Sequence, residues 1–274
     1  MVSGGFTSEE WPTANGAEYK TIKFARCGTE GKTEFFMGLK ERVRLISLGC
    51  PKNLVDTEVM LGLLIADGYR IPDTEEEAEI IIVNTCSFIK EAKQESIETI
   101  LELAELKRRG NCHLLVVAGC LPQRYQDTLM QELPEVDLFI GTGEFQKVVE
   151  ILDRFKESTN PRKGYIGEPG FMYSDNTPRV NTSGRYSAYV KIAEGCSNSC
   201  SYCVIGKIRG KFRSRPRSSI VNEVRKLVEM GVKEINLIGQ DTTLYGRDLN
   251  PPTDLEELLR DLARVDKVEW IRTL

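Results

Sequence analysis

The sequence predicts an α/β fold: an N-terminal open parallel-sheet α/β domain, followed by the first part of a (β/α) barrel. Short apolar runs alternate with longer stretches of helical spacing, which is typical of parallel sheets covered by helices on both faces. A segment rich in Pro, Gly, Ser and Asn separates two such alternations. The 274 residues, 41% hydrophobic and 28% charged, suffice for one large domain or two ordinary ones.

The N-terminal α/β domain is expected over residues 41–157, after an irregular extension at residues 1–40 in which Cys27 has no expected role. Its strands are four apolar runs, at residues 43–48, 80–83, 114–118 and 136–140. A stretch with helical spacing follows each strand, at residues 54–67, 87–109, 122–132 and 144–155. This order predicts a parallel sheet with its helices on both faces.

Residues 158–184 are expected to connect the two domains, because they are rich in Pro, Gly, Ser and Asn. The second domain is expected over residues 185–274, where the alternation begins again. Its strands are expected at residues 188–193, 234–239 and 268–274, and its helices at residues 218–230 and 253–265. The third strand has only begun when the sequence stops.

Composition excludes several functional classes. No apolar run approaches the roughly 18 residues of a membrane span, and the first residues have no basic and apolar signal pattern. We therefore expect a cytoplasmic protein without a membrane partner, whose eight cysteines serve metal binding or catalysis rather than disulfides. A net charge of −4 argues against non-specific nucleic-acid binding, and His113, the single histidine, argues against most zinc enzymes.

Three strands of the first domain end in a cysteine: Cys50, Cys86 and Cys120. The spacings are 36 and 34 residues, one β/α unit each, so all three should emerge at the carboxyl edge of the sheet, where open α/β folds place their sites. The alternative is that these are buried cysteines of ordinary strands. Three thiolates without a histidine favour an iron–sulfur cluster with one open iron over structural zinc, which needs four ligands. Cys112 precedes its strand and is interpreted as incidental.

A second set follows the strand at residues 188–193 in the pattern Cys196-x-x-x-Cys200-x-x-Cys203. Three cysteines in one loop can ligate a cubane cluster and leave one iron free to bind S-adenosylmethionine through its amino and carboxylate groups. The alternatives are a thioredoxin-like pair, which leaves Cys196 unexplained, and a zinc knuckle, which lacks a fourth ligand.

Two weaker features lie near this loop. Residues 207–217 hold six basic residues in eleven, typical of a solvated loop or, alternatively, of a surface that docks an anionic ribosomal particle. The sequence GQDTT at residues 239–243 follows the second strand, at the edge where a barrel keeps its active site; the alternative is a polar turn.

Taken together, these residues resemble the radical S-adenosylmethionine methylthiotransferase family over about residues 41–274. Its members pair a three-cysteine domain with a radical S-adenosylmethionine barrel and a small C-terminal β domain. Within the family, LGCPKN at residues 48–53 and GQDTT at residues 239–243 resemble the branch that modifies a ribosomal protein. The tRNA-modifying branches more typically show GCQMN and GQNVN.

The resemblance implies attachment of a methylthio group to the β-carbon of an aspartate in the twelfth protein of the small ribosomal subunit. It implies two four-iron four-sulfur clusters, S-adenosylmethionine, a ribosomal protein or particle as substrate, and an electron donor such as flavodoxin or ferredoxin. The radical-generating cluster would be ligated by Cys196, Cys200 and Cys203, and the auxiliary cluster by Cys50, Cys86 and Cys120. The residues expected near S-adenosylmethionine are Tyr202, Gln240 and Asp241.

The family's barrel has six strands, so the resemblance also implies a C-terminally truncated chain that is inactive by itself. Two other functions remain open at this point. A tRNA methylthiotransferase would form methylthio-adenosine in tRNA, and a non-catalytic iron–sulfur protein would transfer electrons without cleaving S-adenosylmethionine.

Overall fold

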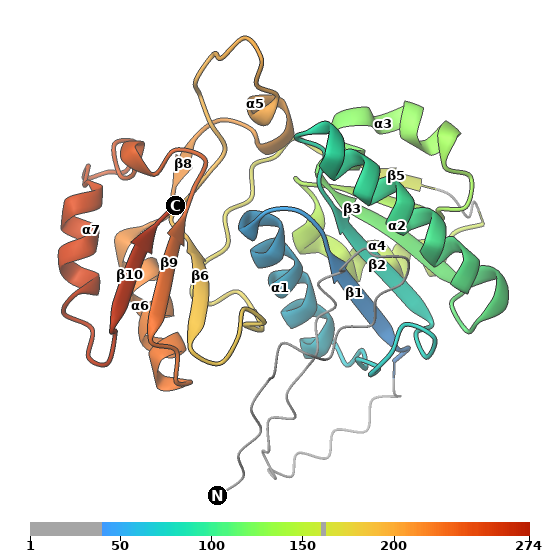
Figure 1. The fold of residues 1–274 in the computed structure, drawn as a ribbon, viewed down its shortest axis with the longest axis horizontal. Coiled ribbons are helices and arrows are strands. Elements are labelled where there is room, and N and C mark those ends of the chain that lie inside the picture. Colours follow the sequence, from blue (N-terminus) through green and yellow to red (C-terminus); the bar gives the residue numbers. More distant parts are fainter. Residues whose placement is uncertain (1–39, 160–162) are drawn as a thin grey trace, which may run out of the picture.

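The structure, a computed structural model, describes residues 40–159 and 163–274. The expectation for Cys27 lies outside the described residues. Two parallel sheets lie side by side, each with helices packed against it (Figure 1). Within the described ranges, no helix has both the length and the apolarity that crossing a bilayer requires.

The first unit is a five-stranded parallel sheet in the order β1-β2-β3-β4-β5. Its strands are β1 (Val43–Ser47), β2 (Ile80–Thr85), β3 (Leu114–Gly119), β4 (Leu138–Gly141) and β5 (Lys163–Tyr165). Its helices are α1 (Pro51–Ala66), α2 (Lys90–Arg109), α3 (Cys120–Glu132) and α4 (Val148–Lys156), the last preceded by the 3₁₀ turn η1 (Phe145–Lys147). The predicted parallel sheet is confirmed, but β5, which falls within the predicted connection, was not expected.

Successive residues of each strand enter two different cores, as the two-residue period of a strand requires. In β2, Ile80 and Ile82 pack with α1 and α4, whereas Ile81 and Val83 pack with α2 and α3. The sheet is therefore buried on both faces, which explains its near-continuous apolar strands. The thiols and polar side chains of the first cysteine set belong to the residues that follow these strands, at the carboxyl edge of the sheet.

The second unit is a three-stranded parallel sheet in the order β10-β9-β6, with a short antiparallel ribbon beside it. Its strands are β6 (Ser187–Lys191), β9 (Glu234–Ile238) and β10 (Trp270–Thr273), and the ribbon is β7 (Ala193–Glu194) with β8 (Arg213–Ser214). Its helices are α5 (Ile205–Arg209), α6 (Arg217–Glu229) and α7 (Leu255–Leu262), with the 3₁₀ turn η2 (Thr242–Leu244). The expected start of a (β/α) barrel is confirmed, and α5 and the ribbon are additions.

Helix α1 packs between its own sheet and β6, so it belongs to both units (Figure 1). Ile238 of β9 enters the same apolar core as α1. A buried chain of ions adds a second connection: Glu58 of α1 pairs with Arg179 at 2.6 Å, and Arg179 pairs with Glu223 of α6 at 2.5 Å. Since buried charges are costly to leave unpaired, these contacts hold α1 and α6 in one arrangement.

Candidate functional site

The three cysteines of the first set lie at the carboxyl edge of the first sheet. Cys50 follows β1, Cys86 follows β2, and Cys120 follows β3, and the three strands are adjacent. The turn before Cys50 approaches Cys86 closely, because a Cβ on Gly49 would lie 2.5 Å from the Cβ of Cys86. Gly49 also has φ +84, in the left-handed region. Both the close contact and the backbone conformation therefore favour glycine at this position.

Asn53, in the first turn of α1 and completely buried, connects all three cysteine-bearing segments. Its Nδ2 donates to the carbonyl oxygen of Leu48 at 3.1 Å and to that of Thr85 at 2.8 Å. Its Oδ1 accepts a hydrogen bond from the Cys120 thiol at 3.5 Å. In the sequence, Asn53 stands out only as the last residue of the LGCPKN motif, so its structural role was not predicted.

Replacing Asn53 by alanine should lower the free energy of unfolding of the metal-free chain by about 3 kcal/mol, because two buried carbonyls lose their donor. Urea denaturation measures this loss. Asn181→Ala is the matched control: its Nδ2 also donates to two carbonyls, at 3.4 and 3.3 Å, but the side chain is only partly buried. We expect less than about 1 kcal/mol for the control. Equal losses in the two variants would contradict the role of Asn53.

Burial keeps two thiols of this set, those of Cys86 and Cys120, protonated in the metal-free chain. Burial raises the pKa of Cys120 to about 11, although the charge of Arg209 opposes the effect, and burial likewise raises the pKa of Cys86. Metal binding must therefore displace protons. Two of the thiols lie at helix amino ends, since Cys50 is the N-cap of α1 and Cys120 begins α3. The helix dipole favours a thiolate there, so both positions suit a metal ligand.

The donor set, the three thiols of Cys50, Cys86 and Cys120, is of the type that iron–sulfur clusters take. Among residues 40–159 and 163–274, no three Cys, His, Asp or Glu side chains are gathered closely enough to hold one metal ion. A cluster takes one thiolate for each iron, so its ligands face a common space instead of touching one atom. Cys112 is not part of this arrangement: it is buried before β3 begins, and its thiol donates to the Leu114 carbonyl at 3.5 Å.

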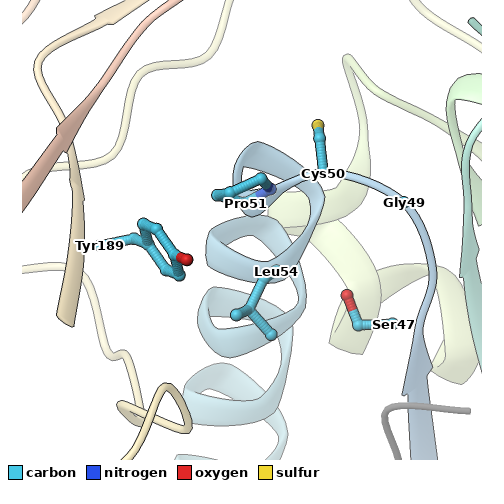
Figure 2. A pocket seen from close by; sticks show the side chains of 6 residues that line it. All are labelled: Ser47, Gly49, Cys50, Pro51, Leu54 and Tyr189. Atoms are coloured by element: carbon cyan, nitrogen blue, oxygen red, sulfur yellow. The ribbon is translucent and has the colours of Figure 1, made fainter. Parts of the chain in front are cut away.

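A shallow pocket opens beside Cys50, between the amino end of α1 and strand β6. Figure 2 shows Tyr189 of β6 facing Pro51 and Leu54 across it, with the thiol of Cys50 pointing away from the end of the helix. Pro51 is the first residue of α1, where a proline costs no hydrogen bond. Space is therefore available next to Cys50 on the side of the second unit.

The second cysteine set occupies an open loop after β7, and the returning chain closes this loop. The backbone N–H of Cys196 donates to the carbonyl of Gly210 at 3.0 Å, and that of Cys203 donates to the carbonyl of Cys200 at 3.1 Å. Cys200 is exposed, and Cys196 and Cys203 are partly exposed. All three thiols thus belong to one accessible loop, which is anchored to Gly210 at its Cys196 end and has a tight turn at Cys200–Cys203.

The predicted S-adenosylmethionine residues lie in different surroundings. Asp241 accepts a hydrogen bond from Asn198, within the cysteine loop, at 3.2 Å, so the turn after β9 touches this loop. Gln240 donates to Glu194 at 3.1 Å, while its own buried Oε1 has no donor within residues 40–159 and 163–274. Tyr202 is 84% exposed. The roles of these three residues stay predictions, as do the ligand roles of the six cysteines.

Four buried charges stand between the two cysteine sets: Lys191 and Glu194 on the strands before the cysteine loop, Arg209 at the end of α5, and Asp56 on α1. Lys191 pairs with Asp56 and, at 2.6 Å, with Glu194. Burial alone would raise the pKa of Glu194, but the charges of Lys191 and Arg209 outweigh it and lower this pKa to about 2. The cluster thus pairs two basic side chains with two acidic ones.

The basic segment at residues 207–217 is not the uniformly exposed loop or docking surface that its composition suggested. That prediction is wrong for Arg209 and Arg215, which are 3% and 0% exposed. Arg215 pairs with Glu223 and stacks on the Tyr173 ring at 4.2 Å. Buried acidic partners thus account for both arginines, and within the segment the exposed basic residues are Lys207 and Lys211.

Two family models match the chain, in this order. Residues 42–141 match Uncharacterized protein family UPF0004, and residues 190–273 match the Radical SAM superfamily. The first match contains Cys50, Cys86 and Cys120, and the second contains the cysteine loop.

The chain also resembles curated relatives across both regions. It is 59% identical to the ribosomal protein uS12 methylthiotransferase RimO of Geobacter sulfurreducens over 86% of the chain and 52% of the relative. Identity to the protein of the same name from Clostridioides difficile is 49%, over 85% of the chain and 52% of the relative. The chain thus spans about half the length of the curated relatives it matches.

Among solved structures, the radical S-adenosylmethionine methyltransferase TsrM from Kitasatospora setae has the same fold, with a TM-score of 0.55 at 14% identity. The match covers 82% of this chain and 51% of TsrM. With a match to each family model and 59% and 49% identity to the two curated relatives over about half of their length, the chain is similar to proteins that carry the name ribosomal protein uS12 methylthiotransferase.

Proposed function

We propose that this protein adds a methylthio group to the β-carbon of an aspartate in ribosomal protein uS12. The arrangement of its cysteines supports this most: three lie at one sheet edge, three lie in one loop, and a shared set of buried side chains joins the two sites. The names of relatives at 49% to 59% identity support the choice of substrate.

Cys50, Cys86 and Cys120 would hold an auxiliary four-iron cluster, and the loop at residues 196–203 would hold a second one that binds S-adenosylmethionine. When bound, these groups supply one-electron chemistry that removes hydrogen from an unactivated carbon, together with the sulfur and the methyl group to be transferred. Three thiols at each site leave one iron free for a further ligand. The Oε1 of Gln240, which has no donor among the described residues and lies beside the loop, suits the amino group of S-adenosylmethionine, which still has N–H donors.

The protein's own residues would hold the two sites at a fixed separation. Asn53 ties the segments of the first set together, and the backbone contact from Cys196 to Gly210 anchors the second. Tyr202 and Asp241 would lie beside the bound S-adenosylmethionine. An acid–base pair is not required, because no side chain is basic enough to deprotonate an unactivated carbon.

The proposed partners follow from this chemistry. A ribosomal protein or particle would be the substrate, and a soluble donor such as flavodoxin or ferredoxin would supply the electrons. Both belong to the cytoplasm, which is the compartment we propose for this protein.

Incubating a purified version of the protein that has the full length of its relatives with uS12, tRNA, dithionite and S-adenosylmethionine tests the proposal. We expect uS12 alone to gain about 46 Da, the mass of a methylthio group less the hydrogen it replaces. Omission of S-adenosylmethionine is the control. Methylthio-adenosine in a tRNA digest, with unmodified uS12, would point to the tRNA branch. Absence of deoxyadenosine from the reaction would favour a non-catalytic electron-transfer protein.

A further inference from the structure

Arg209 reaches from the second unit into the first cysteine set. It ends α5, six residues after Cys203, and its side chain is 3% exposed. Its Nη2 donates to the sulfur of Cys120 at 3.6 Å and to the Oδ1 of Asn53. The next residue, Gly210, accepts the hydrogen bond from Cys196. Arg209 is therefore in contact with one cysteine set, while its own backbone segment anchors the other.

The guanidinium is fixed in this position by its other side. Its Nη1 donates to Asp56 at 2.5 Å and to Glu194 at 3.5 Å, and Lys191 completes the pairing of both carboxylates. This leaves Nη2 directed at Cys120 and Asn53. Only a planar fork of donors can serve the carboxylates and the sulfur at once, because the ammonium of lysine is a single point.

We propose that Arg209 is a positioning residue that donates a hydrogen bond to the Cys120 ligand and thereby raises the reduction potential of the auxiliary cluster. Hydrogen bonds to cluster sulfurs stabilise the reduced, more negative state, and burial strengthens them. A residue of the second unit would thus help to set the reduction potential of the cluster that the first unit holds. This inference rests on the cluster assignment made under the proposed function.

The test is a redox titration, followed by electron paramagnetic resonance, in a background where Cys196, Cys200 and Cys203 are alanine. Only the auxiliary cluster then contributes. Arg209→Gln combined with Asp56→Asn removes the sulfur donor and keeps the buried charges balanced. The matched control, Lys191→Gln with Glu194→Gln, removes the other ion pair of the same four-charge cluster and leaves Arg209 with Asp56, its closer carboxylate partner.

We expect the Arg209→Gln/Asp56→Asn protein to be at least tenfold harder to reduce, about 59 mV for one electron, and the control to change less than threefold. Arg209→Lys, which keeps the charge, should show an intermediate shift, and it decides the point if the double variant does not fold. A potential that is the same in the background protein and in the Arg209 variants would overturn the inference and leave the cluster assignment standing. Absence of iron from the background protein would overturn that assignment and the inference with it.

Discussion

Replacing Cys196, Cys200 and Cys203 together by alanine is expected to abolish the cleavage of S-adenosylmethionine and to leave half of the iron. The complete protein should carry about eight irons, four at each site, and the variant about four. The three thiols share one accessible loop, so their replacement leaves no cavity in an apolar core and should leave the fold intact. Iron analysis and chromatography of deoxyadenosine after anaerobic reconstitution measure both effects.

Cys112→Ala is the matched control for this variant. This cysteine is buried in the apolar core of the first unit, where its thiol donates to a backbone carbonyl, and it belongs to neither set. We expect the control to keep about eight irons and normal deoxyadenosine formation. Loss of all iron from the loop variant would show that the two sites do not form independently.

The sheet edge that carries the first cysteine set could be predicted because two independent patterns coincide there. Apolar runs such as residues 80–83 mark buried parallel strands, and parallel topology then brings the strand ends to one edge. The place of the three cysteines at this edge could be predicted from their positions directly after such runs: Cys50, Cys86 and Cys120. The strand β5 escaped prediction because its three residues are too few to establish a period.

The contacts that organise the site could not be predicted in the same way. Arg209 and Cys120 are 89 residues apart and meet only because α5 folds back onto the carboxyl edge of the first sheet. In the sequence, Arg209 is one of several basic residues in a short segment, and charge alone indicates exposure. Burial of an arginine depends on partners such as Asp56 and Glu194, which come from other elements. Tertiary packing, and not local pattern, decides this.

The opposite result is expected when Cys50, Cys86 and Cys120 are replaced by alanine. This variant should still form deoxyadenosine but should no longer add a methylthio group to uS12. The three residues lie at the edge of the first sheet, whereas the loop that would bind S-adenosylmethionine is anchored within the second unit by its contact with Gly210. Mass spectrometry of uS12 and chromatography of deoxyadenosine, in one reaction, separate the two steps.

The folding of this variant needs its own check, because Cys86 and Cys120 are buried and each loses a sulfur. The cost should be on the order of 1 kcal/mol for each small cavity, which a folded unit of this size tolerates. The connection through α1, Glu58 and Arg179 does not involve these cysteines and should keep the two units together. If the circular dichroism spectrum is unchanged and deoxyadenosine formation is nevertheless lost, the two sites act as one catalytic unit and the proposed division of roles is wrong. Deoxyadenosine formation without methylthio transfer would assign the sulfur step to the first cysteine set.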